Sequence, residues 1–192
     1  AAALALDSTL LGELLGRVDL RELLDPAVVA ETERQLQWLT ERRRPRDAED
    51  VVELLRTLGD LSDAELADRG VRPDWLTALA AARRILPVRI AGEQRWIGVE
   101  DAGRLRDALG VALPPGVPLA YLEPVADPLG DLVARYARTH GPFRAASCAA
   151  RFGLGVAVVQ QALRRLAATG TVVAGEFSPL TAGSEPVAGT EW

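Results

Sequence analysis

The chain has 192 residues, of which 26% are charged and 48% are hydrophobic, as in a globular protein of one large or two small domains. Its formal net charge of −5 argues against strong autonomous binding to nucleic acid, because phosphate neutralisation dominates the affinity of such proteins. Lysine is absent, which excludes a Walker-type phosphate loop and a Schiff-base amine. A single histidine and a single cysteine also exclude a zinc site of the usual ligands within the chain.

Cysteine usage and hydropathy indicate a cytoplasmic protein without a membrane segment. Cys148 has no partner for an internal disulfide, which fits a reducing compartment. No apolar run approaches the roughly 20 residues that span a bilayer, and the opening AAALAL lacks the length and basic flank of a signal peptide. The sequence starts without methionine and ends at Trp192, so we expect it to be a segment of a longer protein.

Residues 1–46 are predicted to form a helical connector. A leucine-rich helix follows residues 7–9, and another helix is expected over residues 25–40. The connector ends in the densest basic run of the chain, formed by Arg42, Arg43 and Arg44. This run is a candidate for phosphate contacts, and the alternative is a solvated linker whose charge the neighbouring acidic residues balance.

Residues 47–110 are predicted to form a winged-helix module. Apolar spacing predicts a helix over residues 48–58, an S-x-x-E capping box starts a second helix at Ser62, and Pro73 starts a third. Two strands are expected within residues 86–99. Three helices followed by a hairpin are typical of the winged helix-turn-helix.

A stiff, proline-rich spacer at residues 111–126 leads to a second module of the same kind at residues 127–192. Its expected elements are helices at 128–140, 145–151 and 156–169, a strand at 171–173, a long mobile wing loop after Phe177 and a returning strand at 190–192. The predicted fold is therefore mainly α with small β-hairpins, as tandem winged-helix modules preceded by a helical connector.

The two modules align as an internal repeat with an offset of 82 residues. The matching pairs include Gly59 with Gly141, Leu61 with Phe143, Leu66 with Cys148, and Arg69 with Arg151. Because Cys148 takes the place of a buried leucine, we interpret it as a core residue and not a nucleophile. Arg144 replaces the capping Ser62, so the second module should lack this cap. His140, at a helix end, is expected to be a capping or surface residue.

The third helix of the second module carries the better candidate nucleic-acid contacts. Its inward residues are expected to be Val156, Val159, Leu163 and Leu166, which leaves Gln161, Arg164 and Arg165 facing outward. Glutamine and arginine suit base edges and phosphates, and the alternative is a plain solvated face. The corresponding face of the first module, with Thr77, Ala78 and Ala81, is poor for a groove. No catalytic or metal-binding constellation is predicted.

Residues 3–26, 82–143 and 149–177 resemble the large helicase-related (Lhr) proteins, most closely the actinobacterial members. The middle stretch, with its spacer prolines and aromatics, is the specific part of this similarity. The resemblance implies the start of a C-terminal tandem winged-helix region in an ATP-dependent helicase. Such a helicase moves 3′ to 5′ on single-stranded DNA, unwinds duplexes that include RNA–DNA hybrids, and is implicated in DNA repair.

The same resemblance implies a helicase core in the same protein, with ATP and Mg²⁺ bound by that motor and no cofactor in this chain. The family's C-terminal region is similar to a class of DNA glycosylases, but no family catalytic residue can be carried onto this sequence. We therefore expect a non-enzymatic segment that guides single-stranded or tailed duplex DNA or holds domains together. The alternative is a purely protein–protein module, for self-association or for docking onto the motor.

Overall fold

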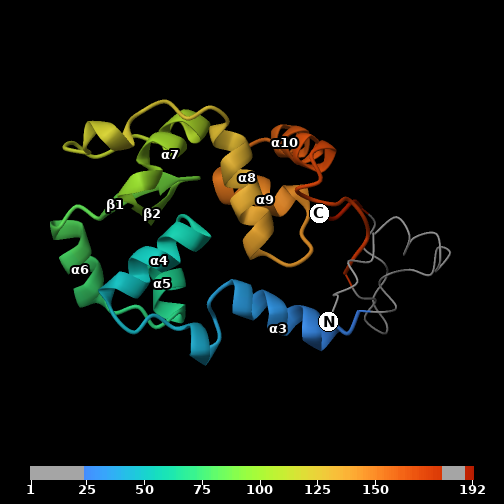
Figure 1. Ribbon diagram of the computed structural model, residues 1–192, viewed down its shortest axis with the longest axis horizontal. Helices are drawn as coiled ribbons and strands as arrows, with labels where there is room; N and C mark the ends of the chain where they lie inside the picture. The colour runs from blue at the N-terminus through green and yellow to red at the C-terminus, as the bar shows by residue number, and fades with distance from the viewer. Residues whose placement is uncertain (1–23, 179–188) are drawn as a thin grey trace, which may run out of the picture.

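The computed structural model describes residues 24–178 and 189–192 and has the predicted fold, mainly α with a small β-hairpin (Figure 1). Its helices are α3 (Pro26–Leu36), α4 (Ala48–Leu58), α5 (Asp63–Asp68), α6 (Pro73–Ala81), α7 (Ala102–Leu109), α8 (Pro128–Thr139), α9 (Ala145–Phe152) and α10 (Val156–Ala168). Strands β1 (Ile85–Ile90) and β2 (Glu93–Gly98) form an antiparallel hairpin. Short 3-10 turns are η1 (Glu41–Arg43), η2 (Val99–Asp101) and η3 (Leu119–Tyr121). The predicted helix at residues 10–15 and the wing loop over 179–188 lie outside the described residues.

Local capping explains where the helices of the first module begin. The Ser62 hydroxyl accepts a hydrogen bond from the Glu65 amide, and the Glu65 carboxylate accepts one from the Ser62 amide, which confirms the capping box. Pro73 is the first residue of α6, where its missing N–H costs nothing. The predicted helix boundaries of this module therefore hold.

A third short strand segment completes each wing. In the first module the Leu61 and Trp96 backbones exchange hydrogen bonds of 3.0 and 2.7 Å. In the second module Phe143 and Trp192 exchange bonds of 3.3 and 3.0 Å. Since Phe143 matches Leu61 in the sequence repeat, the repeat extends to the sheet, with Trp192 in the role of Trp96.

The predicted strand over residues 171–173 is wrong. The Thr171 amide donates to the Leu166 carbonyl, so the first residue of this stretch is held by the end of α10, whose last residue is Ala168. The bridge to the returning segment forms later, where Gly175 and Glu191 exchange two backbone hydrogen bonds. Residues 171–173 have strand-type side chains, but the first backbone amide of the stretch, that of Thr171, is already bonded to the end of the helix.

The β1–β2 hairpin lies between two cores because alternate residues face opposite sides. Ile85 and Trp96 pack with the first core, which α4, α5 and α6 supply. Leu86, Val88 and Ile97 pack with the second core, which also contains α7, α8, α9 and α10. The first module therefore contributes its hairpin to the core of the second. Module boundaries at 46/47, 110/111 and 126/127 remain predictions.

Buried ion pairs join the two modules across this shared core. Asp60, between α4 and α5, pairs with Arg95 of β2 at 2.6 Å and with Arg151 of α9 at 3.1 Å. Asp101 of η2 receives a two-pronged contact from Arg135 of α8. A guanidinium fork matched to a carboxylate fixes orientation as well as distance. These contacts hold the modules in one relative orientation.

Candidate nucleic-acid interface

Helix α10 buries one stripe and leaves the opposite face to solvent. Val159 and Leu163 are buried against α8 and α9, as the periodicity predicts. Ala162 is buried beside them, and Leu166, also predicted to face inward, is half-buried against the same core. Val156 departs from its predicted inward position, because it is 43% exposed. The following two residues, Ala157 and Val158, are exposed as well, so the first turn of α10 extends past the packed part of the helix.

The three predicted contact residues on α10 are all exposed, which confirms their orientation though not their role. Arg165 pairs with Asp127 at 3.4 Å, but the two side chains are 52% and 58% exposed. Such a solvated pair is weak, so it leaves Arg165 free to exchange partners. Among the described residues, neither Arg164 nor Gln161 has a hydrogen-bonding or ionic partner through its side chain.

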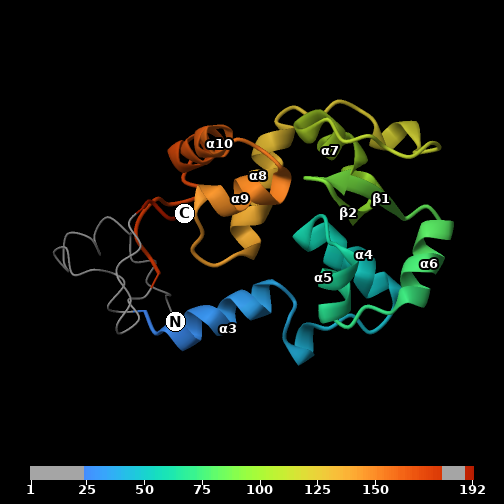
Figure 2. The ribbon, with the colours of Figure 1, turned by 180° about the vertical axis from the view of Figure 1, so that it is seen from behind.

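The basic run at η1 is exposed too, but it belongs to a different surface. Arg44 pairs with Glu41 at 3.3 Å, and the Arg43 guanidinium lies 5.8 Å from the centre of the Trp38 ring. The connection from α3 to α4, which carries Arg42 and its neighbours, lies at the lower edge of the molecule, whereas α10 lies at the upper edge (Figures 1 and 2). The structure therefore does not bring the two predicted basic groups together.

The first module offers no comparable surface, as the sequence predicts. Its third helix, α6, carries Asp74, which pairs with Arg72 at 2.7 Å. Its wing is also occupied: Ala91, at the hairpin tip, packs on Gly153 at the turn between α9 and α10. In this chain the first wing is a contact between modules.

The one thiol and the one imidazole take structural roles. Cys148 is fully buried, and burial raises the pKa of its thiol to about 12, so it is not a nucleophile at neutral pH. His140 stacks on Tyr136 and hydrogen-bonds the Tyr136 carbonyl at 2.8 Å, which caps the end of α8. Burial lowers the pKa of His140. Its capping role is confirmed, although the ring is half-buried and not at the surface.

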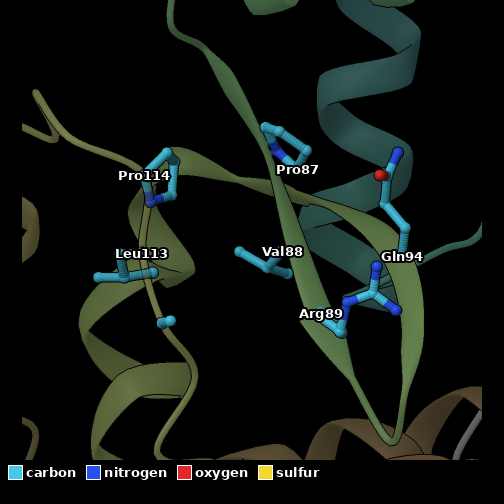
Figure 3. Close-up of a pocket in the computed structure, with 7 residues that line it drawn as sticks. Pro87, Val88, Arg89, Gln94, Leu113 and Pro114 are labelled. Atoms are coloured by element: carbon cyan, nitrogen blue, oxygen red, sulfur yellow. The ribbon is translucent and has the colours of Figure 1, made fainter.

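Metal ligands and hollows are the other features of residues 24–178 and 189–192 that bear on chemistry. No three carboxylate, imidazole or thiolate groups gather there in a way that could hold a metal ion. A hollow of about 350 Å³ lies between β1 and the spacer (Figure 3). Pro87 and Val88 line one side and Leu113 and Pro114 the other, with Arg89 the only ionisable lining residue. Such a lining can hold a chain segment but supplies no acid–base pair.

A family model for the winged-helix domain of large helicase-related proteins matches residues 22–124, more than half of the chain. The chain belongs to the large helicase-related (Lhr) family. It is 56% identical over 188 residues to an Lhr helicase and probable uracil glycosylase of Mycolicibacterium smegmatis, and 43% identical over 178 residues to an Lhr helicase/uracil glycosylase of Escherichia coli. These matches cover 96% and 90% of this chain. The Lhr chain spans about 12% of the length of either relative.

Sequence reasoning missed two groups of residues in this Lhr chain. The first is the set of buried ion pairs around Asp60, for which the match of Arg151 to Arg69 in the repeat was the available signal. The second is a hollow that contains Arg138, Phe177 and Trp192. No spacing in the sequence brings these three together, because they come from α8 and from both sides of the second wing.

Among the described residues, none of the helices has the length and apolar content that a bilayer crossing requires.

Proposed function

We propose that this Lhr chain is a non-catalytic segment that guides nucleic acid in an ATP-dependent 3′-to-5′ DNA helicase acting in DNA repair. The observation that carries the proposal is the outer face of α10, where Gln161, Arg164 and Arg165 are exposed on a helix without an acidic residue. Guanidinium groups bind phosphate oxygens, and amide groups can reach base edges.

The net charge of −5 limits what this face can do alone. Phosphate neutralisation sets most of a protein's affinity for nucleic acid. Two arginines would therefore add only modestly to binding, and the helicase motor would supply most of it. The ligand would be single-stranded or tailed duplex DNA, with RNA–DNA hybrids as further substrates. ATP and Mg²⁺ would bind in the motor, the protein would act in the cytoplasm, and any uracil glycosylase activity would lie in other parts of the whole protein.

One observation favours a second candidate, a protein-docking role. The first turn of α10 exposes Val156 and Val158, at 43% and 44%. In a groove-binding helix this turn commonly meets the base edges, and valine offers them no hydrogen bond. These two residues would instead suit an apolar surface on the motor or on a second copy of the chain.

Salt-dependent binding of the chain to a tailed DNA duplex tests the first proposal. Arg164→Ala/Arg165→Ala should lower affinity roughly tenfold and reduce the slope of log K against log salt by about 1 for each lost phosphate contact. The charge-matched control is Arg56→Ala/Arg72→Ala, which removes two exposed arginines from the first module. It should leave the slope unchanged.

Equal loss in both double variants would mean that only net charge matters, and it would contradict the proposal. The docking alternative is tested with Val158→Asp, which places a charge on the exposed first turn of α10. If light scattering shows self-association that this variant abolishes, and Arg164→Ala/Arg165→Ala leaves DNA affinity and its salt slope unchanged, the docking role replaces the guiding role.

A further inference from the structure

A second hollow lies at the base of the second wing. It is lined by Arg138 of α8, by Val172 and Val173 just after α10, and by the aromatic rings of Phe177 and Trp192. Its volume is about 310 Å³, at the lower end of the range of about 300 to 1,000 Å³ that small-ligand pockets cover. The hollow opens to solvent on the second module, which also carries α10.

Its polar groups are free to bind a ligand. Arg138 is exposed, and its guanidinium has no carboxylate or carbonyl partner in the part of the chain that the structure describes. Within the same residues the indole N–H of Trp192 has no acceptor either. Among the described residues, most other arginines pair with a carboxylate, as Arg104 does with Asp101. Arg138 therefore leaves an uncompensated positive charge at the hollow.

The backbone holds the two aromatic residues in place. The Glu191 carboxylate accepts hydrogen bonds from the Phe177 and Ser178 amides, at 2.6 and 2.7 Å. Trp192 is fixed by its two backbone bonds to Phe143. At Gly175, a Cβ atom would lie 2.5 Å from the Phe177 ring, so the ring rests directly over this glycine. Both rings are positioned without being fully buried.

Aromatic faces beside an unpaired guanidinium are the features that bind single-stranded nucleic acid. Bases stack on the rings irrespective of sequence, and the cation holds the backbone phosphate. We propose that this hollow receives one unpaired nucleobase of a single strand, with the adjacent phosphate on Arg138. The indole N–H of Trp192 can donate to an edge of that base. The site deepens the proposed guiding role and rests on it.

The position of the hollow suits a strand that also passes α10. Thr171, which lies on its rim, is three residues beyond the last residue of α10. A strand whose phosphates contact Arg164 and Arg165 can thus continue to the wing base, where a stacked base would fix its register. A peptide would meet the same apolar walls, but it carries no phosphate for Arg138.

The test compares a deoxythymidine oligonucleotide with a strand of equal length that contains abasic residues. The wild-type chain should bind the abasic strand roughly tenfold more weakly, because stacking is lost while the phosphates remain. Phe177→Leu, which keeps an apolar side chain, should bind both strands at the weaker level. Binding of the base-containing strand should also quench a fluorescence component that Trp192→Phe removes.

Arg138→Ala gives an independent readout, since this side chain is exposed. It should weaken binding to both strands several-fold, whereas Arg89→Ala, a matched exposed arginine in the first module, should not. Equal binding of the two strands by the wild-type chain would overturn the base-binding site. If Arg164→Ala/Arg165→Ala still weakened binding in that case, the guiding role would stand without it. Binding of neither strand would remove both.

Discussion

The third helices of the two modules, α6 and α10, follow equivalent turns but present opposite surfaces. Helix α6 carries the acidic Asp74 and no basic residue, whereas α10 carries two arginines and no acidic residue. The wings differ in the same sense. The tip of the first wing packs on Gly153 of the second module, and the base of the second wing is open beside Arg138. One copy supports the structure, and the other leaves its surface available.

One repeated position kept the same task in both copies. Arg69, which follows α5, donates to the Gln37 carbonyl and side chain, both at 2.8 Å, and so attaches the first module to the connector. Its match, Arg151 of α9, pairs with Glu65 and Asp60 and so attaches the second module to the first. In both modules this arginine therefore joins the module to the segment before it, whereas the surfaces of the third helices differ.

The largest effect is expected at Asp60, whose match in the second module is Pro142. Asp60 and Arg95 are 4% and 6% exposed, so Asp60→Ala leaves a buried guanidinium without its main acceptor. The free energy of unfolding in urea should fall by about 3 kcal/mol. Asp74→Ala breaks only an exposed pair and should change stability little. Similar small losses in both variants would refute the idea that Asp60 joins the modules, where it binds Arg95 of the first module and Arg151 of the second.

A smaller effect is expected where the first wing meets the second module. Gly153 has φ +66, and a Cβ atom there would lie 3.2 Å from the Ala91 Cα. Gly153→Ala should therefore cost about 2 kcal/mol, from left-handed strain together with the clash. Gly155→Ala is the matched control, because its backbone is ordinary and its nearest atom lies 3.9 Å away. Equal unfolding midpoints for the two variants would show that the wing contact is loose.

The smallest effect concerns His140, which matches Leu58 of the first module. Burial lowers the pKa of His140, so the unfolded chain takes up the proton first as the pH falls. The stability that the neutral ring provides is present above about pH 6.5 and is lost below it. His140→Phe, which keeps a ring stacked on Tyr136, should remove this dependence. Urea unfolding midpoints at pH 7.5 and 5.5 measure this pH dependence of stability. If the midpoint of the variant fell as much between the two pH values as that of the wild type, His140 would not be its source.

The sequence predicts the helices well because their signals are local. Caps at Ser62 and Asp127 and prolines at the first helical turn fix where helices begin, and apolar spacing fixes which face packs. The lost cap is also confirmed, since Arg144 makes no capping hydrogen bond. Local signals failed at residues 171–173. Their β-branched composition favours a strand, but the Thr171 amide donates to a carbonyl at the end of α10.

For the interface, the sequence by itself determined which residues α10 turns outward, because a helix fixes the direction of every side chain from its spacing. Only the tertiary structure decided that Arg42–Arg44 and α10 lie on different edges of the molecule. It also decided that the first wing packs against the second module, and that Arg138 lines one hollow with Phe177 and Trp192. The physical reason is range. Periodicity and capping act over a few residues, whereas these arrangements depend on a hairpin shared by two cores and on carboxylates far along the chain.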